Sequence, residues 1–369
     1  MGNISKDIGI IGAGAWGCAV AKCLGEAGHR VQIWAYEAEV CTEINTKHRN
    51  TRYLPDVELP AGVSANTDLL TVASGKRFII FATPSLFTLP AVKSLIAIPD
   101  ILEGRTIIGV LTKGFVTTPR GPRMMLQAME DYLPGSYKDS LVYISGPSHA
   151  EEVASGKLTG LIAASRNPLN SVRFRNLLNT HPLMVFSSTD IIGVQVSAAV
   201  KNVIAIAFGV MDAIKETSPV VGDNTESLLL AAGLNEIQTL AAAIGSTHPS
   251  KTLTSIAGVG DLDVTCRSIH GRNRRFGREI VLKNLLDGYS DIYDVIANFT
   301  RIGYLAEGVV AVTYVKDFVQ QYKLKMPICM SVFRILNKES QPADEIQGFL
   351  RTLANSKHLN THLSQIKVR

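Results

Sequence analysis

The first half of the chain alternates short apolar runs with polar or amphipathic stretches, from Ile8 to about Ser188. Apolar runs of this length, separated by stretches of helical periodicity, are typical of parallel strands joined by crossover helices. We therefore expect an α/β fold with a doubly wound, mostly parallel sheet. The predicted strands are Asp7–Ile11, Val31–Trp34, Phe78–Ala82, Thr106–Leu111, Leu141–Ser145 and Leu161–Ala164.

The pattern changes after Thr189, where strand signals end and helical periodicity with Gly or Pro punctuation begins. A chain of 369 residues is long enough for about two domains. We therefore expect an α/β domain over residues 1–188 and an all-α domain over residues 189–369. The tail beyond Leu353 is polar and weakly periodic, so we expect it to be mobile. The predicted helices of the second half span residues 190–215, 225–245, 272–284, 308–322 and 328–338.

The longest apolar run, from Ile191 to Met211, contains one charged residue, Lys201. The run is about as long as a membrane span, but Gln195, Ser197 and Asn202 interrupt it and no basic or aromatic belt flanks it. We expect a buried central helix and no integral membrane association. A buried ammonium is costly unless it is paired or neutralised, which lowers the pKa of such a lysine below ~10.4. Lys201 then either exchanges a proton in a reaction or snorkels to the surface as a structural residue.

The charge balance favours small anionic ligands over nucleic acid, because the formal net charge is only +5 and no long basic block is present. The densest basic cluster consists of Arg272, Arg274, Arg275 and Arg278. Phe276 is the only aromatic residue within it, so a nucleic-acid-binding patch is the weaker interpretation. We expect Arg274, Arg275 and Arg278 in this cluster to form a solvated helix face.

The cysteine pattern indicates a reducing compartment. The chain has five cysteines, an odd number, without Cys-x-x-Cys spacing, and a strand pattern begins almost at the N-terminus. We therefore expect free thiols, a cytoplasmic location and no metal site.

A glycine-rich turn follows the first strand, with Gly12, Gly14 and Gly17 opening a predicted helix. In a dinucleotide-binding turn the first glycine permits the tight turn, the second lets the backbone approach a pyrophosphate, and the third allows close strand-helix packing. The helix N-terminus adds free N–H groups for the anion. Because the motif stands between a strand and a helix, we predict dinucleotide binding, with Ala15 and Trp16 also at the cofactor.

The end of the second predicted strand indicates which dinucleotide binds. A carboxylate there bonds the adenosine ribose, whereas a basic residue receives a 2′-phosphate. Ala35 occupies the usual acid position, Tyr36 and Glu37 follow it, and no Arg or Lys lies between Val31 and Cys41. This favours NAD, with NADP left open. Glu37 can equally be a helix-start acid.

Four further segments occur in one order along the chain, and with Tyr53-Leu54-Pro55 and Ala306-Glu307-Gly308 they carry a family resemblance. The chain resembles NAD(P)-dependent glycerol-3-phosphate dehydrogenase, particularly the bacterial type, almost end to end. The resemblance implies a Rossmann-like N-terminal domain followed by a helical domain like that of 6-phosphogluconate dehydrogenase. The four segments are Leu111-Thr112-Lys113-Gly114, Ser145-Gly146-Pro147-Ser148-His149-Ala150, Val200-Lys201-Asn202-Val203, and Gly258 to Gly277.

The resemblance also implies the reaction, a reversible reduction of dihydroxyacetone phosphate to sn-glycerol 3-phosphate that supplies glycerophospholipid synthesis. Lys201 matches the family's proton donor and acceptor, in agreement with its position in the apolar run. Lys113 would add positive charge at the developing oxyanion, and Asp261 would orient Lys201. These three residues are the predicted catalytic group.

The resemblance places further residues at substrate and cofactor. Arg272 and Asn273 match the phosphate-binding pair, and an Arg fork together with a helix N-terminus suits a phosphate dianion. The other predicted substrate residues are Lys113, Asn202, Thr265, Gly146 and Ser148. The other predicted cofactor residues are Tyr36, Glu37, Pro84, Lys113, Ala150, Arg272 and Glu307.

The chain departs from the family pattern at residues 215–232, where Glu226 replaces a cation, and at His149, where the family more often has Phe. We expect His149 to be a half-buried packing residue. Altered regulation or reduced activity would follow if the missing cations normally close the site.

Two alternatives therefore stay open. One is a related dehydrogenase acting on another 2-hydroxy or 2-keto compound, and the other is a catalytically silent NAD(H)-binding sensor. We expect a small-molecule substrate, no nucleic-acid partner and a homodimer.

Overall fold

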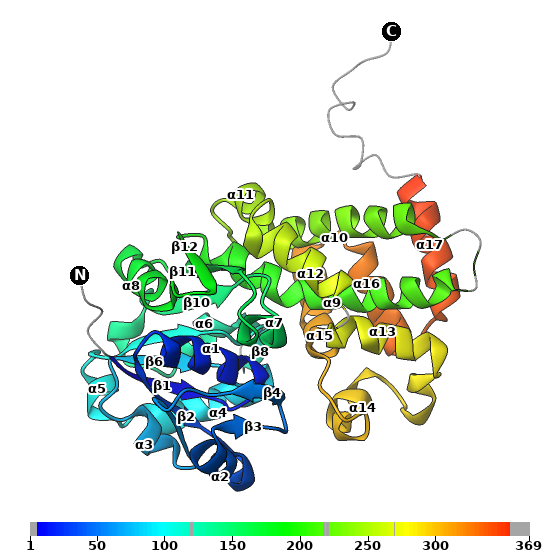
Figure 1. The fold of residues 1–369 in the computed structure, drawn as a ribbon. Helices are drawn as coiled ribbons and strands as arrows, with labels where there is room; N and C mark the ends of the chain where they lie inside the picture. Colours follow the sequence, from blue (N-terminus) through cyan, green and yellow to red (C-terminus); the bar gives the residue numbers. More distant parts are fainter. Residues whose placement is uncertain (1–5, 119–120, 217, 219–220, 269, 355–369) are drawn as a thin grey trace. The chain divides into compact units, whose positions relative to one another are not determined.

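The computed structural model describes residues 6–118, 121–216, 218, 221–268 and 270–354 (Figure 1). Contacts between residues group the chain into two compact units. One unit comprises the described part of Met1–Ala198 together with Ile244–Asp261, and the other comprises Ala199–Ala243 and the described part of Leu262–Arg369. The predicted division after residue 188 stays a prediction. The predicted mobile tail beyond Leu353 lies almost entirely outside the described residues.

The α/β unit is built on an eight-stranded sheet with the strand order β12-β11-β10-β7-β6-β1-β2-β5. Adjacent strands run parallel except β10 and β11, which pair antiparallel. The mostly parallel α/β sheet is therefore confirmed. The strands are β1 (Asp7–Ile11), β2 (Arg30–Trp34), β5 (Val63–Asn66), β6 (Phe78–Phe81), β7 (Ile107–Val110), β10 (Val142–Ser145), β11 (Thr159–Ala164) and β12 (Leu183–Ser188).

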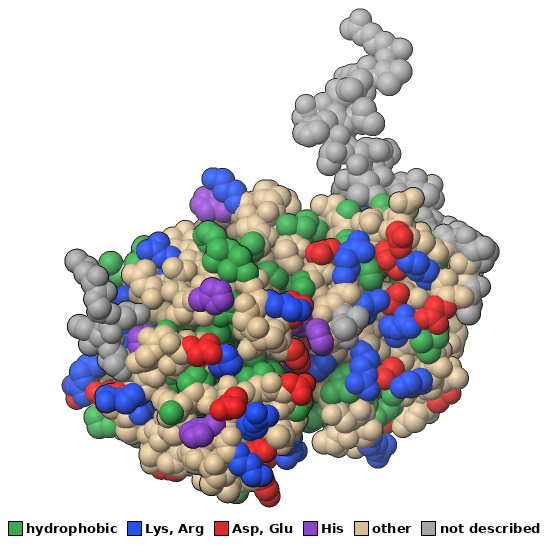
Figure 2. Space-filling model, in the orientation of Figure 1, with side chains coloured by type: hydrophobic (Ala, Val, Ile, Leu, Met, Phe, Trp, Pro, Cys, Tyr) green, Lys and Arg blue, Asp and Glu red, His purple; other side chains and the backbone are tan. Residues whose placement is uncertain are grey.

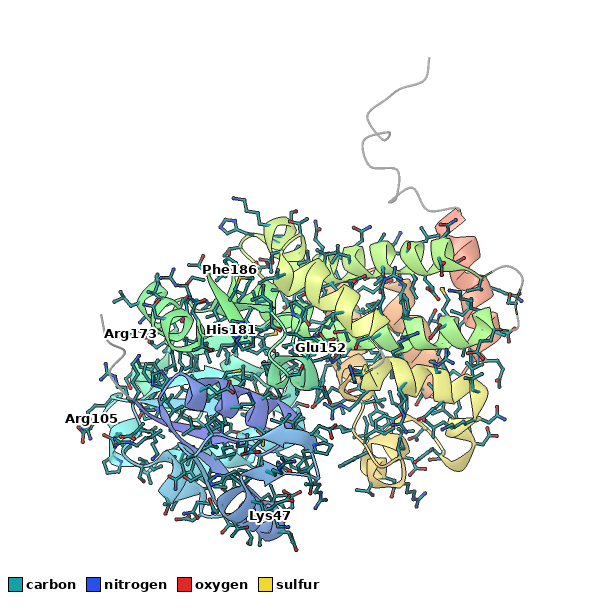
Figure 3. All side chains as sticks on the ribbon, viewed as in Figure 1. Lys47, Arg105, Glu152, Arg173, His181 and Phe186 are labelled. Carbon is teal, nitrogen blue, oxygen red and sulfur yellow. The ribbon has the colours of Figure 1, made fainter. Side chains whose placement is uncertain are left out.

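Each predicted strand has a counterpart here, with bounds shifted by up to two residues, whereas β5 and β12 were not predicted. On β12, which is an edge strand, Leu183 and Val185 are buried while Met184 and Phe186 are exposed, the alternation of a strand with one face to solvent; Phe186 is labelled in Figure 3. Two small antiparallel hairpins complete the strands. They are β3 (Arg49–Asn50) with β4 (Leu54–Glu58), and β8 (Phe115–Thr118) with β9 (Gly121–Met124).

The core of this unit lies on the central strands, where every residue of β6, β7 and β10 is buried. Gly109 on β7 lets the sheet approach Phe174, since a Cβ there would lie 2.4 Å from the Phe174 ring. Phe174 also meets Phe78 edge to face at 5.5 Å. The helices are α1 (Ala15–Glu26), α2 (Ala38–Lys47), α3 (Leu69–Ala73), α4 (Ser85–Leu95), α5 (Pro99–Leu102), α6 (Met125–Glu130), α7 (Ala150–Ala154), α8 (Pro168–Leu178) and α11 (Pro249–Leu253).

Asp190 attaches the segment Ile244–Asp261 to the α/β unit. Its buried carboxylate accepts hydrogen bonds from the hydroxyls of Ser246 at 2.7 Å and Thr252 at 2.5 Å. It also accepts from the backbone N–H groups of Gly193 and Thr247, each at 3.1 Å. Burial by itself raises the pKa of Asp190, but the four donors outweigh it and hold the pKa below its ordinary value. A local sequence pattern could not reveal these contacts.

The helical unit is organised around α9 (Ile191–Lys215), which begins in the α/β unit and continues past Ala198. Glycines allow other helices to pack closely on it. A Cβ on Gly277 would lie 2.2 Å from the Ile206 carbonyl oxygen, and one on Gly308 would lie 2.5 Å from that of Asn202. The helices around α9 are α10 (Asp223–Ala243), α12 (Asp261–Arg267), α13 (Arg272–Leu282), α14 (Ile292–Ala297), α15 (Glu307–Tyr322), α16 (Pro327–Leu336) and α17 (Pro342–Ala354).

Within the described part of the chain, α9 alone has the length and composition of a membrane span, and its most apolar window is entirely buried. The predicted buried central helix is therefore confirmed, as are the other predicted helices within a few residues of their ends.

Candidate active site

The glycine-rich turn between β1 and α1 has the geometry that its sequence predicts. Gly12 has φ +123°, a conformation that favours glycine, and a Cβ there would lie 3.0 Å from the Thr83 nitrogen. A Cβ on Gly17 would lie 2.0 Å from the Gly12 carbonyl oxygen, so strand and helix pack backbone to backbone. A Cβ on Gly14 would meet no described atom within 4 Å, which leaves open space above this residue.

These features fit a dinucleotide pyrophosphate. Gly14 is the N-cap of α1, and among the described residues no side chain caps that helix and no acidic residue stands in its first turn. The N–H groups of Ala15 and Trp16 therefore begin a helix whose positive end is available to an anion. Asn50 supports the turn from the β3–β4 hairpin, donating from Nδ2 to the Ala13 carbonyl oxygen at 2.7 Å. This contribution of Asn50 was not predicted.

In the loop after β2, the Tyr36 side chain is exposed, whereas the Glu37 side chain contacts neighbouring residues. Tyr36 is 82% exposed. Glu37 is the N-cap of α2, but its side chain makes no capping hydrogen bond. Its Oε1 instead accepts from the Tyr53 hydroxyl at 2.6 Å and lies 3.8 Å from the Arg52 guanidinium. Burial and this hydrogen bond raise the pKa of Tyr53. Glu37 does stand at the start of α2, as one of the two interpretations expected, but its carboxylate contacts Tyr53 and Arg52, so a basic residue lies beside it.

A chain of threonine hydroxyls underlies the strand ends where Pro84 and Lys113 begin their loops. The Thr83 and Thr88 hydroxyls lie 2.9 Å apart, and Thr88 lies 3.3 Å from the Thr112 hydroxyl. Thr112 also donates to the Thr83 carbonyl oxygen at 2.8 Å. These bonds connect the ends of β6 and β7 to α4. The threonine hydroxyls therefore fix the loop after β6 and the loop after β7. Pro84 itself is the N-cap of α4.

In the α/β unit, Lys113 lies close to three other residues that were predicted for the active site. Its Nζ is 3.4 Å from both the Gly146 carbonyl oxygen and the Ser148 hydroxyl, and 3.5 Å from Oδ2 of Asp261. Gly146 has φ +147°, and a Cβ there would lie 2.6 Å from the Gly160 carbonyl oxygen. The structure therefore brings together Lys113, Gly146, Ser148 and Asp261, which are far apart in the sequence. We call them, with Ser145, the strand-end group.

Asp261 follows a π-helical turn, Ile256–Gly260, and is completely buried at 0% exposure. Such turns are rare and occur often at functional sites. The Ser145 hydroxyl donates to Oδ2 of Asp261 at 3.1 Å, so this oxygen receives both a hydroxyl and the Lys113 ammonium. Sequence reasoning quoted Ser145 as part of a motif but gave it no role. Its place as the last residue of a buried strand was the available signal.

The helical unit holds a second set of predicted residues. Lys201 is only 3% exposed, so the snorkelling interpretation is wrong. Next to it, Oδ1 of Asn202 accepts from Nδ2 of Asn273 at 3.0 Å, and Oδ1 of Asn273 accepts from the Gly308 N–H at 2.9 Å. Asn202, Asn273 and Gly308 form what we call the amide chain, which links α9, α13 and α15. Glu307 is the first residue of α15, and Thr265 is buried on α12.

Arg272 opens α13, as the sequence predicted, with Gly271 as N-cap and no side-chain cap among the described residues. Arg272 is exposed, and no ion pair joins it to any carboxylate in the described part of the chain. Its guanidinium and the helix N-terminus therefore suit an external anion such as a phosphate.

The neighbouring arginines correct the solvated-face prediction. Arg274 and Arg278 are partly buried and pair with Asp212 at 2.6 and 2.8 Å. These two side chains stabilise the packing of α13 on α9. Arg275 is exposed and pairs with Glu279 at 3.0 Å.

In the divergent segment that begins at the end of α9, a lysine pairs with two carboxylates. Glu226, which replaces a cation of the family pattern, is buried, and Lys215 lies 3.2 Å from its Oε1. Lys215 also lies 2.5 Å from Asp223.

His149 is half-buried as the N-cap of α7, in line with the packing prediction, and Ala150 is the first residue of that helix.

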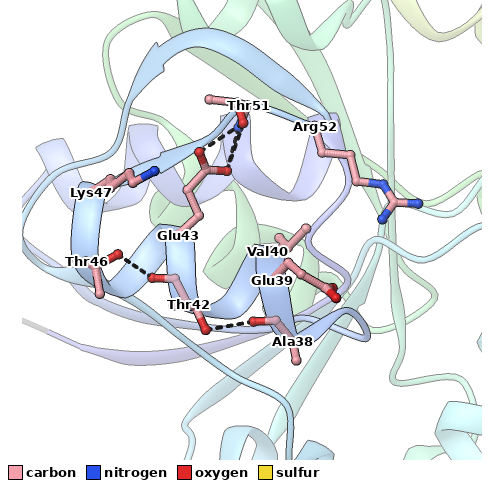
Figure 4. A pocket seen from close by; sticks show the side chains of 9 residues that line it. All are labelled: Ala38, Glu39, Val40, Thr42, Glu43, Thr46, Lys47, Thr51 and Arg52. Carbon is pink, nitrogen blue, oxygen red and sulfur yellow. Dashed lines mark hydrogen bonds between the residues drawn. The ribbon is translucent and has the colours of Figure 1, made fainter.

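The surface of the α/β unit has two hollows. One, of about 580 Å³, is lined by α2 together with Thr51 and Arg52 (Figure 4). The other, of about 840 Å³, is lined by residues of α1, β4 and α7. On the face drawn in Figure 2, basic and acidic side chains are interspersed.

Comparisons with known proteins agree along the chain. A family model described as NAD-dependent glycerol-3-phosphate dehydrogenase N-terminus matches residues 7–170, and the corresponding C-terminus model matches residues 190–347. The glycerol-3-phosphate dehydrogenase (NAD(P)+) of Treponema denticola is 54% identical over 354 residues, covering 94% of this chain and 99% of that protein. The enzyme of the same name from Treponema pallidum is 50% identical over 342 residues, covering 90% and 96%. A crystal structure of glycerol-3-phosphate dehydrogenase from Coxiella burnetii has a TM-score of 0.81 at 31% identity, covering 94% and 99%.

Proposed function

Because the chain belongs to the NAD-dependent glycerol-3-phosphate dehydrogenase family, we propose that it interconverts dihydroxyacetone phosphate and sn-glycerol 3-phosphate with NAD(P)H. The observation that carries the proposal is the burial of Lys201, at 3% exposure, beside the amide chain of Asn202, Asn273 and Gly308. A buried amine next to oriented amides suits proton transfer to a substrate oxygen. A silent dinucleotide-binding domain has no need for it.

When bound, the nicotinamide cofactor would supply the hydride to C2 of the ketone, and the oxygen on C2 must then gain a proton. Lys201 holds that proton and donates it, and in the reverse direction it accepts the hydroxyl proton. General acid catalysis of this kind contributes roughly 10²–10⁴-fold. Lys113 places its ammonium where negative charge develops on the carbonyl oxygen, and Asp261 balances the charge of Lys113 at 3.5 Å.

The phosphate of the substrate requires a different environment. Arg272 offers a planar fork of donors, and the first turn of α13 adds N–H groups with no acidic side chain nearby in that turn. Asn273 follows Arg272 on the same helix and is held by the amide chain, which fixes the direction of its side chain. We infer that the unphosphorylated ketone loses these contacts and reacts poorly.

Cofactor binding falls to the α/β unit. The N-terminus of α1 and the open space above Gly14 would hold the pyrophosphate, with Ala15 and Trp16 beside it. Pro84, Lys113, Ser148 and Ala150 stand at or just after the carboxyl ends of β6, β7 and β10, where open α/β sheets bind the reacting half of a ligand. Tyr36 and Glu37 would lie at the adenosine half, and Glu307 and Arg272 would also contact cofactor.

The experiment that tests this function is NADH oxidation with four ketones: dihydroxyacetone phosphate, unphosphorylated dihydroxyacetone, pyruvate and ketopantoate. The phosphorylated ketone should exceed each of the others in kcat/KM by at least about 100-fold, because only it engages Arg272. A preference for any of the other three would instead assign the chain to a related dehydrogenase.

The buried Glu226, which replaces a cation of the family pattern and pairs with the partly exposed Lys215, motivates a second candidate, a sensor that binds NADH without turnover. The sensor predicts NADH binding with no oxidation by dihydroxyacetone phosphate at any pH from about 6 to about 9. Measurable turnover anywhere in this range removes it.

We also propose that the enzyme works in the cytoplasm as a homodimer and supplies glycerol 3-phosphate for phospholipid synthesis. The described cysteines are all free thiols, which suits a reducing compartment. Tyr293 and Tyr322 of the helical unit are exposed aromatic residues, which suits an interface. Size exclusion with light scattering tests the dimer, and a monomeric mass at micromolar concentration would contradict it.

A further inference from the structure

We propose that Arg52 determines how strongly the enzyme binds a dinucleotide bearing a 2′-phosphate, and that Glu37 and Tyr53 hold Arg52 at that position. The proposal rests on the dehydrogenase function proposed above. It assigns cofactor discrimination to a residue outside β2 and the loop that follows it.

The position comes from the fold. In a dinucleotide-binding sheet, the residue at the carboxyl end of the second strand meets the adenosine ribose. Glu37 stands just beyond that position, the third residue after the end of β2 at Trp34 and directly before α2 starts at Ala38. Arg52 belongs to the turn between β3 and β4, which brings its guanidinium to 3.8 Å from the Glu37 carboxylate.

Glu37 is partly neutralised by its neighbours. Its Oε1 accepts the Tyr53 hydroxyl at 2.6 Å, and the charge of Arg52 offsets its own. No donor from the described residues contacts its Oε2. A free carboxylate at this point would repel a 2′-phosphate, whereas a paired one tolerates it and still accepts a ribose hydroxyl through Oε2. The pair therefore suits both NAD and NADP.

Arg52 keeps its donors available. The distance of 3.8 Å to Glu37 exceeds a hydrogen bond, and the side chain is 59% exposed. The guanidinium lies over the Tyr53 ring, 5.3 Å from its centroid, which orients the group without using its N–H donors. A guanidinium presents a planar fork that matches phosphate oxygens.

The surroundings leave room for a ligand. Arg52 lines the hollow of about 580 Å³ beside α2, with Ala38 and Glu39 among the other lining residues (Figure 4). Figure 4 shows Arg52 extending from the hairpin segment that also carries Thr51. Thr51 is fixed to α2 because its hydroxyl donates to Oε1 of Glu43 at 2.9 Å. The backbone under Arg52 is thus anchored, and its side chain, 59% exposed, is accessible to a phosphate.

The same hairpin supplies a matched control. Arg49 is an exposed arginine of β3 that pairs with Glu58 of β4 at 3.3 Å. Removing Arg49 takes away the same charge from the same hairpin without touching Glu37. Both arginines make exposed ion pairs, which contribute little to folding, so both variants should fold.

The experiment is calorimetric binding to the full-length enzyme, which needs no turnover. The probes are adenosine 2′,5′-bisphosphate against 5′-AMP, and NADP+ against NAD+, so each pair differs only in the 2′-phosphate. Arg52→Gln should weaken adenosine 2′,5′-bisphosphate and NADP+ by roughly 10-fold while 5′-AMP and NAD+ change less than about 2-fold. Arg52→Lys should retain part of the affinity because it keeps the charge. Arg49→Gln should change none of the four by more than about 2-fold.

Each other result has a distinct meaning. Equal weakening of all four ligands by Arg52→Gln, or an effect of Arg49→Gln as large as that of Arg52→Gln, overturns the assignment. Wild-type enzyme that binds NAD+ but not NADP+ also overturns it and leaves the dehydrogenase function intact. Wild-type enzyme that binds neither dinucleotide removes the proposed function as well. Glu37→Gln gives a supporting result if it tightens adenosine 2′,5′-bisphosphate by about 3-fold, since a negative charge is lost.

Discussion

Two sets of buried polar groups, one in each unit of the molecule, are held in different ways. In the α/β unit, the strand-end group is ionic: Oδ2 of Asp261 meets the Lys113 ammonium at 3.5 Å and the Ser145 hydroxyl at 3.1 Å. In the helical unit, the amide chain is neutral: Asn273 bonds Asn202 at 3.0 Å and the Gly308 N–H at 2.9 Å. Both sets are assembled from segments far apart in the sequence.

The difference indicates a division of labour. An ionic group in a poorly solvated place changes its interaction energy when substrate charge develops nearby, and it can therefore stabilise a transition state. Neutral amides bonded to each other change little, but they fix the positions of the helices that carry them. We therefore expect variants of the strand-end group to act on turnover and variants of the amide chain to act on substrate binding and stability.

Lys201 is the sharpest test of this comparison, because it brings a basic group into the otherwise neutral surroundings of the amide chain. Lys201→Met should lower kcat by at least about 100-fold, since the proton donor is lost while the apolar stem is retained. Steady-state kinetics with dihydroxyacetone phosphate and NADH measures it.

The control for Lys201 is Lys316→Met, which removes a partly buried lysine of α15 that pairs with Asp317 at 3.2 Å. Its kcat should stay within about 2-fold of wild type. A small effect of Lys201→Met would assign this lysine to packing. The predicted lowering of the Lys201 pKa is tested by the basic limb of the wild-type pH–rate profile.

Asn273 tests the neutral half of the comparison. Asn273→Ala removes the link between α9 and α15 and leaves Oδ1 of Asn202 and the Gly308 N–H without this partner. We expect kcat/KM for dihydroxyacetone phosphate to fall about 30-fold, mainly through KM, and unfolding to become easier by roughly 1–3 kcal/mol. Kinetics and denaturant unfolding measure the two effects.

A matched asparagine lies outside the amide chain. Asn298, at the end of α14, bonds Asp294 at 2.6 Å, and Asn298→Ala should leave KM unchanged. If Asn273→Ala lowers stability but leaves KM at the wild-type value, Asn273 serves only as a scaffold.

The sequence predicted the central strands and the long helices because their apolar periodicity is strong. It missed β5, in which Val63-Ser64-Ala65-Asn66 is short and half polar, and β12, where the exposed Met184 and Phe186 are as apolar as the buried Leu183 and Val185 and hide the alternation. It could not show that β10 and β11 pair antiparallel, since hydrophobicity does not encode strand direction. Long-range contacts such as those of Asp190 had no local signal.

The site shows the same limit. Lys201 stood out because a lone lysine in an apolar run has few explanations, and the glycine turn stood out because its context is specific. Arg52 was not predicted because it lies well beyond Cys41 in the sequence, and only the fold of the β3–β4 hairpin brings it back to Glu37. Arg274 and Arg278 were misread because their partner, Asp212, lies on another helix. Pairings of this kind depend on tertiary structure.

Ser145 tests the ionic half of the comparison on a smaller scale. Ser145→Ala removes the hydroxyl donor to Asp261 but leaves Lys113 beside it, so the carboxylate is less firmly held. We expect kcat to fall by about 10-fold and the pH–rate profile to shift, because a positioned charge controls proton transfer.

Ser165→Ala is the matched control. Ser165 is equally buried, but its hydroxyl donates to the Leu141 carbonyl oxygen at 2.8 Å and accepts from the Asn167 N–H at 3.1 Å, so its partners are backbone groups. It should lower stability by about 1 kcal/mol with an unchanged pH–rate profile. Identical profiles for the two variants would show that Ser145 has only a packing role.

Glu236 sharpens the comparison by placing a carboxylate in the helical unit, and its expected effect is the smallest. Its two oxygens accept the Ile328 N–H at 2.6 Å and the Cys329 N–H at 3.0 Å at the start of α16. Burial raises the pKa of Glu236 from 4.5 to about 7, although these N–H donors lower it. The folded state therefore favours the protonated form. Its contribution to stability is complete below about pH 4.5 and is lost as the pH rises through about 7.

Glu236→Gln should remove this slope, which amounts to on the order of 1 kcal/mol between about pH 5 and about pH 8. Thermal unfolding across that range measures it. Glu345 is the control with the opposite sign, because its hydrogen bond to Arg334 lowers the pKa of Glu345 and places its titration below this range. Glu345→Gln should leave the slope as it is in wild type. If Glu236→Gln and wild type lose stability equally as the pH rises, the Glu236 carboxyl group at the start of α16 does not titrate in this range.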